Sequence, residues 1–220
     1  NTDDVIFSGK GNDQISVAKS GAHTIDTGAG DDHILAGVRN DDIDGGAGDD
    51  TLILDSSPSS AELDYSYIAN EGDEREYVDH TSSFSDVAAF ADAYADAREV
   101  RLITNSGTTF TNIERFEVQG QGDEDLLVYQ DGVTTYQGGD QFSRSYDTFF
   151  ADWSDRDAAV SWVNTGENAQ PLTDNDAVTV SGMERLLLKT GGGNEVIDNS
   201  AHNTDDVIFS GKGNDQISVA

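Results

Sequence analysis

The chain has 220 residues, which is enough for one or two domains with a hydrophobic core. Its 43 Asp and Glu residues stand against 12 Lys and Arg, and the formal charge of −31 excludes nucleic acid and anionic membrane surfaces as partners, because like charges repel. Without cysteine, the chain has no disulfide framework and no thiol chemistry.

A charge this high, with only 35% apolar residues, has to be neutralised before the chain can compact. High salt could neutralise it, as in halophilic proteins, but bound divalent cations would do so locally and more strongly. No apolar run reaches membrane-spanning length, so we expect no membrane insertion. The start does not resemble a signal peptide, which means little because we expect the chain to be an internal part of a longer protein.

Residues 203–220 are identical to residues 1–18, and both read NTDDVIFSGKGNDQISVA. Chance does not produce such an identity, so the offset of 202 residues predicts one repeat of a tandem array, followed by the start of the next. Neighbouring tandem repeats of the same chain are then expected partners. The alternative is a stretch copied to cover a cut edge. Tandem repetition favours reach, spacing or multivalency over a single catalytic event.

Residues 1–53 have a nine-residue period. Large aliphatic residues recur at spacings of ten, nine, nine and nine, at Ile15, Ile25, Ile34, Ile43 and Leu52. Glycine-rich turns of six residues precede three of them: SGKGND, TGAGDD and GGAGDD. This period fits neither an amphipathic helix nor a long strand. It fits a solenoid in which a turn alternates with a three-residue strand that carries one inward aliphatic side chain.

These turns resemble the RTX nonapeptide repeat, G-G-x-G-x-D-x-U-x, where U is a large aliphatic residue. The resemblance is strong over residues 1–53 and 190–220 and weak between them. It implies a parallel β-roll in which successive nonapeptides lie on opposite sides, so that two of them make a coil of eighteen residues. It also implies Ca²⁺ as the cofactor, held between stacked turns by backbone carbonyls and by the sixth residue of each repeat. Glycine allows the positive φ and the close approach of backbone to ion that such turns need.

The register makes the two sides of this roll unequal. One side collects the turns that are close to the consensus, and their sixth residues are Asp13 (Asp215), Asp32, Asp50 and Glu195. The opposite side collects turns that lack most of the glycines and end in Asp4 (Asp206), His23 and Asp41. We therefore predict calcium along one edge and a sparse or empty opposite edge.

The residues expected to bind calcium are the glycines, hydroxyl residues and acids of the consensus turns, together with one acid from a weaker alignment of residues 120–128 with 190–198. They are Ser8, Gly9, Gly11, Asp13, Thr27, Gly28, Gly30, Asp32, Gly45, Gly46, Gly48, Asp50, Thr190, Gly191, Gly193, Glu195, Ser210, Gly211, Gly213 and Asp215, and Asp125 from the weaker alignment.

Residues 54–189 are predicted to form a β-rich insert made of two degenerate excursions. Residues 108–118 align with 178–188, and 50–57 align with 147–154, so the chain leaves the solenoid twice and returns twice. Composition predicts strands at 51–55, 100–104, 108–118, 126–129, 148–152, 159–163 and 177–188. A helix at about 83–98 is expected to cover an open face of the roll, with a partner-binding helix as the alternative.

Other chemistry-bearing residues give weaker signals. The adjacent pairs Glu114–Arg115 and Glu184–Arg185 favour structural ion pairs over acid–base catalysis. The four histidines have no metal-ligand spacing. Five aromatic residues of the insert are expected in a small core, with a glycan-stacking platform as the alternative; they are Tyr65, Tyr67, Tyr136, Trp153 and Trp162. Because no nucleophile or phosphate-binding motif occurs, we do not expect an enzyme.

The sequence thus predicts an all-β chain: a parallel β-roll, or β-solenoid, in residues 1–53, a β-rich insert with one helix in 54–189, and a roll in 190–220 that continues into the next repeat. Resemblance to RTX proteins implies a calcium-dependent extender, or spacer, of a giant secreted adhesin on the bacterial cell surface. The family's type I secretion implies export of the unfolded chain and folding on Ca²⁺ outside the cell. The alternatives are a glycan- or protein-binding module made multivalent by repetition, and an appendage of an RTX enzyme, which the long period disfavours.

Overall fold

The computed structural model describes residues 3–17, 21–37, 40–55, 64–94, 97, 99–102, 107–119, 124–130, 135–138, 146–164, 170–172 and 178–220. These residues are mostly β-strand, with one α-helix among them. The chain forms two compact units, residues 1–120 and 121–220. None of the described residues forms a helix with the length and apolarity needed to cross a membrane.

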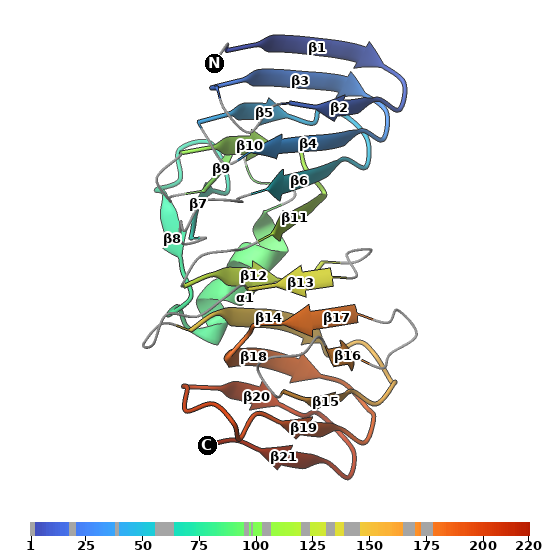
Figure 1. The fold of residues 1–220 in the computed structure, drawn as a ribbon, viewed down its shortest axis with the longest axis vertical. Coiled ribbons are helices and arrows are strands. Elements are labelled where there is room, and N and C mark those ends of the chain that lie inside the picture. Colours follow the sequence, from blue (N-terminus) through green and yellow to red (C-terminus); the bar gives the residue numbers. More distant parts are fainter. Residues whose placement is uncertain are drawn as a thin grey trace. The chain divides into compact units, whose positions relative to one another are not determined.

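In the first unit, the chain alternates between two parallel sheets (Figure 1). β1 (Val5–Lys10), β3 (Thr24–Ala29), β5 (Asp42–Asp44) and β10 (Thr109–Thr111) pair in one sheet. β2 (Gln14–Ser16), β4 (His33–Gly37), β6 (Thr51–Asp55) and β11 (Arg115–Gln119) pair in the other. We call one strand of each sheet, with the turns that join them, a coil.

Each sheet stacks one inward apolar residue per strand. Ile25, Ile43 and Phe110 are register partners in the first sheet, and each side chain is 1% exposed. In the second sheet Ile34 pairs with Leu52, and both are fully buried. The nine-residue period therefore marks the interior positions, because the strand that follows each turn contributes its central side chain to the core between the two sheets.

The excursion in the first unit extends the β1 sheet by three antiparallel strands and adds the helix. β9 (Glu99–Leu102) pairs with β10 and with β7 (Tyr65–Ile68), and β8 (Glu76–Val78) pairs with β7. α1 (Phe84–Ala93) begins after Ser83, whose hydroxyl accepts a hydrogen bond from the Asp86 amide. Its Phe90 is fully buried, stacks on Tyr65 at 5.1 Å between ring centroids, and lies 6.4 Å from Phe116.

The second unit repeats the parallel pattern. β12 (Leu126–Val128), β14 (Thr148–Trp153), β18 (Arg185–Thr190) and β20 (Val207–Phe209) form one sheet, and β15 (Ser161–Val163), β19 (Val196–Asp198) and β21 (Gln216–Ser218) form another. β13 (Thr135–Gln137) pairs in parallel with β17 (Val178–Ser181), which is antiparallel to β16 (Gln170–Leu172). Phe149 and Trp162 meet edge to face in the core, 5.9 Å apart.

Two of the predicted strands are each divided into two in the structure. The strand predicted at 108–118 is divided into β10 and β11, and the strand predicted at 177–188 is divided into β17 and β18. The breaks come at Asn112 and Gly182, which have φ of 52° and 66° and so cannot continue a strand. The helix ends at Ala93, five residues before the predicted end, and residues 95, 96 and 98 lie outside the described part of the chain.

Candidate metal centre

An acidic residue stands directly before each strand of the β2–β4–β6–β11 sheet. Asp13 precedes β2, Asp32 precedes β4 and Asp50 precedes β6. Because these strands are parallel and in register, the acids stack above one another along one edge of the sheet. We call this stack the consensus column. It brings together three of the acids that the consensus turns predict for one side, Asp13, Asp32 and Asp50.

Backbone amides link the consensus column from coil to coil. The Asp13 amide donates to Oδ1 of Asp32 at 2.7 Å, and the Asp32 amide donates to Oδ1 of Asp50 at 2.8 Å. The Asp50 amide continues the series by donating to Oε2 of Glu114 at 2.7 Å. Each bond uses only one oxygen of the accepting carboxylate.

The second oxygens are buried and make no hydrogen bond. Oδ2 of Asp13, of Asp32 and of Asp50 are all in this state, and the Asp32 and Asp50 residues are 2% and 0% exposed. A buried carboxylate oxygen that lacks a partner is costly, since it gives up its hydration without compensation. A cation between successive carboxylates would supply that compensation.

The pKa values of two of the buried acids also favour a bound cation. Burial, helped by the charges of Glu114 and Asp32, raises the pKa of Asp50 to about 6. Burial, together with the neighbouring Asp215, raises the pKa of Glu195. In the absence of a cation, the raised pKa values mean that Asp50 and Glu195 hold protons more tightly than ordinary carboxylates do.

The glycines of the consensus turns let successive turns approach closely. Both glycines of the second turn have positive φ, 93° at Gly28 and 135° at Gly30, a region that favours glycine. A Cβ at Gly28 would collide with the carbonyl oxygen of Gly9, one coil back. The turns therefore stack backbone on backbone. The first residues of two turns add to this stack. Ser8 Oγ donates to the Thr27 carbonyl at 2.9 Å, and Thr27 Oγ1 donates to the Gly45 carbonyl at 2.6 Å.

The second unit contains two further linked sets of acids. The Asp125 amide donates to Oδ1 of Asp147 at 2.8 Å, and the Asp147 amide donates to Oε2 of Glu184 at 2.9 Å. Separately, the Glu195 amide donates to Oδ1 of Asp215 at 3.1 Å. Both carboxylate oxygens of Glu195 and Oε1 of Glu184 are buried and make no hydrogen bond. A hydrogen bond from the Ser210 hydroxyl lowers the pKa of Asp215.

Three of these acids, Glu114, Asp147 and Glu184, were not among the residues predicted from the sequence to bind calcium. Glu114 and Glu184 were interpreted as partners of the adjacent arginines, yet both accept backbone amides of another coil, and Arg115 pairs with Asp49 at 2.6 Å. The signal that could have found them is the acid directly before a parallel strand. The alignment of residues 50–57 with 147–154 had already placed Asp147 opposite Asp50.

The residues that stand directly before the strands of the β1–β3–β5–β10 sheet form a linked series of a different kind, and we call their side the opposite edge. The Asp4 amide donates to Nδ1 of His23 at 3.3 Å, the His23 amide to Oδ1 of Asp41 at 2.8 Å, and the Asp41 amide to Oγ1 of Thr108 at 3.4 Å. His23 and Asp41 are buried, at 1% and 2% exposure. A histidine and a threonine thus occupy positions that carboxylates hold in the consensus column.

The consensus column fits calcium better than it fits other metals. Ca²⁺ takes six to eight oxygen ligands and accepts backbone carbonyls among them. Among the described residues, no three Asp, Glu or His side chains gather as a metal-binding group. Two carboxylates from neighbouring coils would therefore have to be completed by turn carbonyls, a donor set that suits hard cations and not zinc.

The five aromatic residues that could have formed a glycan platform are buried. Tyr65, Tyr67, Tyr136, Trp153 and Trp162 are each at most 4% exposed. Within each unit they contact other rings of the core, as Tyr65 contacts Phe90 and Trp162 contacts Phe149. These residues serve packing and leave no stacking surface for a sugar.

A comparison with protein families gives one match. The RTX calcium-binding nonapeptide repeat matches in four copies, over residues 1–16, 20–56 and 188–217. These ranges include the consensus column from Asp13 to Asp50 and the Glu195–Asp215 pair. No curated protein and no solved structure matched the chain.

Proposed function

The chain carries RTX calcium-binding nonapeptide repeats, which bind Ca²⁺, and from this premise we propose that it is a calcium-dependent structural repeat, an extender of a large secreted bacterial adhesin. Its two parallel sheets are the walls of a β-roll, stapled by calcium along the consensus column. The duplicated eighteen residues support tandem repetition, and repetition of a structural unit gives length.

One observation carries the proposal: the consensus column buries carboxylate oxygens that make no hydrogen bond, at Asp13, Asp32 and Asp50. Without a cation, these groups oppose folding through desolvation and mutual repulsion. With calcium, the binding free energy adds directly to the folding free energy, because the ligands converge only in the folded chain. The same carboxylates thus act against folding at low calcium and for it at high calcium.

This dependence suits export through a type I channel. In a cytosol poor in free calcium, a chain with a formal charge of −31 repels itself and stays unfolded. Millimolar calcium outside the cell then folds it and prevents its return. The buried position of the aromatic residues supports a structural role over a glycan-binding one.

The test is a calcium titration of the chelator-treated chain, followed by far-UV circular dichroism, with magnesium as the control. We expect a cooperative gain of β-structure with calcium only, since Mg²⁺ demands octahedral geometry and keeps its own waters. The Asp32→Asn variant should shift the midpoint to higher calcium. An exposed neighbour in the same turn, replaced as Asp31→Asn, is the matched control and should leave the midpoint nearly unchanged. A chain fully folded in chelator would disprove calcium-dependent folding.

A further inference from the structure

The duplicated segment forms a coil at each end of the chain, and each copy is covered on a different face. Its first copy, residues 1–18, forms β1 and β2, which pair with β3 and β4 (Figure 1). Its second copy, residues 203–220, forms β20 and β21, which pair with β18 and β19. The same sequence therefore has a following coil as its neighbour in the first copy and a preceding coil as its neighbour in the second copy.

The space around equivalent glycines shows which face of each copy is covered by a neighbouring coil. Gly9 and Gly11 in the first copy would have nothing within 4 Å of an added Cβ, so the face toward a preceding coil is open. The equivalent residues in the second copy are closed: a Cβ at Gly211 would collide with the carbonyl oxygen of Gly191, and one at Gly213 with that of Gly193.

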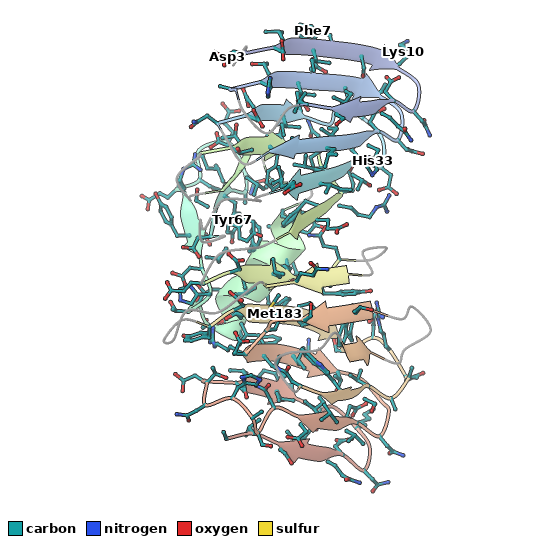
Figure 2. All side chains as sticks on the ribbon, in the orientation of Figure 1. Asp3, Phe7, Lys10, His33, Tyr67 and Met183 are labelled. Carbon is teal, nitrogen blue, oxygen red and sulfur yellow. The ribbon has the colours of Figure 1, made fainter. Side chains whose placement is uncertain are left out.

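Two apolar side chains on the outer surface of β1 are more exposed than their equivalents in the second copy. Val5 and Phe7 are 66% and 71% exposed, and Figure 2 labels Phe7 on the outermost strand of its sheet. In the second copy, Val207 is half-buried and Phe209 is 53% exposed, because β18 now lies beside them. A preceding coil covers apolar surface that the first copy leaves in water.

We propose that the eighteen-residue segment is a single coil shared by two successive copies of this chain. The strands β18 and β19 of one copy cover its preceding face, and the strands β3 and β4 of the next copy cover its following face. Both sheets then run through the junction without a linker. This inference rests on one part of the proposed function, namely the tandem repetition of the chain.

The two sets of hydrogen bonds are compatible because they use different atoms. Asp215 accepts the Glu195 amide through its carboxylate at 3.1 Å, whereas its equivalent, Asp13, donates its own amide to Asp32 at 2.7 Å. On the opposite edge, the Leu186 amide donates to the Asp206 carboxylate at 2.9 Å, and the equivalent Asp4 donates its amide to His23. A shared coil can make all four bonds at once, so the consensus column continues across the junction.

The strand register is also compatible. Val196 pairs with Gln216, and the equivalent Gln14 pairs with His33. In two joined copies, Val196 of the first and His33 of the second therefore lie two strand spacings apart, at about 10 Å. Gln14 and Thr51 of one copy are separated by the same two spacings, through His33.

These two pairs give a matched experiment on a chain of two copies, residues 1–202 followed by 1–220. The chain has no cysteine, so spin labels can be placed at Val196→Cys of the first copy and His33→Cys of the second. A second protein carries Gln14→Cys and Thr51→Cys in one copy. Dipolar broadening of the frozen-state electron paramagnetic resonance spectrum is read in saturating calcium and in chelator.

A shared coil gives the junction pair the same broadening as the control pair in calcium, corresponding to about 10 Å. A junction pair without broadening overturns the inference, whatever the control pair shows. Broadening of both pairs in chelator as well as in calcium upholds the shared coil and defeats calcium-dependent folding, so the two proposals fail in different ways.

Discussion

The backbone amide of Asp13 donates a 2.7 Å hydrogen bond to Oδ1 of Asp32, nineteen residues further along the chain. This bond fixes the orientation of the Asp32 carboxylate, so that Oδ2 stays buried and makes no hydrogen bond. The same relation links Asp32 to Asp50. Each coil therefore orients the carboxylate of the next one, and the orienting group is a backbone amide that only a substitution to proline removes.

The calcium affinity of the first unit should depend on one edge only. Replacing Asp32→Asn keeps an oxygen that can accept the Asp13 amide but removes the charge of a candidate ligand, and should weaken calcium binding by about tenfold or more. Asp41→Asn makes the matching change on the opposite edge, where the carboxylate is equally buried and accepts the His23 amide. It should leave the affinity within about twofold. Isothermal titration calorimetry measures both, and equal losses would contradict the predicted asymmetry.

Equivalent glycines in the two copies of the duplicated segment should respond differently to substitution. Gly9→Ala adds a methyl group in open space and costs only the strain of positive φ, about 1–2 kcal/mol. Gly211→Ala adds the same group against the Gly191 carbonyl, so it should destabilise the second unit by a larger amount. Urea unfolding in saturating calcium compares them. A larger loss for Gly9→Ala would show that the terminal coils are not stacked as described.

Acid should partly replace calcium. The pKa of Asp50 is raised to about 6 in the folded chain, against 3.8 for an ordinary Asp, because of burial and neighbouring carboxylates. The folded state therefore binds more protons than the unfolded state between about pH 4 and 6, and the stability of the calcium-free chain falls as the pH rises through this window. Circular dichroism of metal-free protein should show more β-structure at pH 5 than at pH 7.5. In saturating calcium the difference should shrink, because the carboxylates are ionised at both values. An Asp50→Asn variant is the control, in which the pH dependence should be weaker.

The helix should stabilise the first unit without belonging to the metal site. Phe90 is fully buried against Tyr65, Tyr67 and Phe116, so Phe90→Ala should cost about 3–5 kcal/mol. Thermal unfolding in saturating calcium measures the loss. Calorimetry of the still-folded variant should give an unchanged affinity, since Phe90 lies outside the consensus column. A lost calcium site with unchanged stability would contradict this division of roles.

The sequence predicted the periodic parts of the fold best. The strand at 51–55 was correct at both ends, and the nine-residue period located Ile25, Ile34, Ile43 and Leu52 in the core. In these segments each coil repeats the same local pattern, so a short window contains the information.

Two strands of the first excursion were missed because no local period marks them. β7 pairs with β9, more than thirty residues after Tyr65, and β8 pairs with β7. Glu114 and Glu184 were missed for a similar reason. Each lies next to an arginine, which favoured an ion pair, while the amide that each actually accepts belongs to a neighbouring coil that is far away in the sequence.

The amide-to-carboxylate bonds join residues separated by 18, 19, 20, 22, 37 and 64 positions in the sequence. The bonds thus join the starts of neighbouring strands, whatever the length of the chain segment between those strands. A segment as long as the one that carries α1 can be inserted after a strand, provided that an acid precedes the next strand. Such a scaffold can acquire new surface loops by insertion without losing its metal-binding edge, which makes the connections between coils natural sites for grafting foreign sequence.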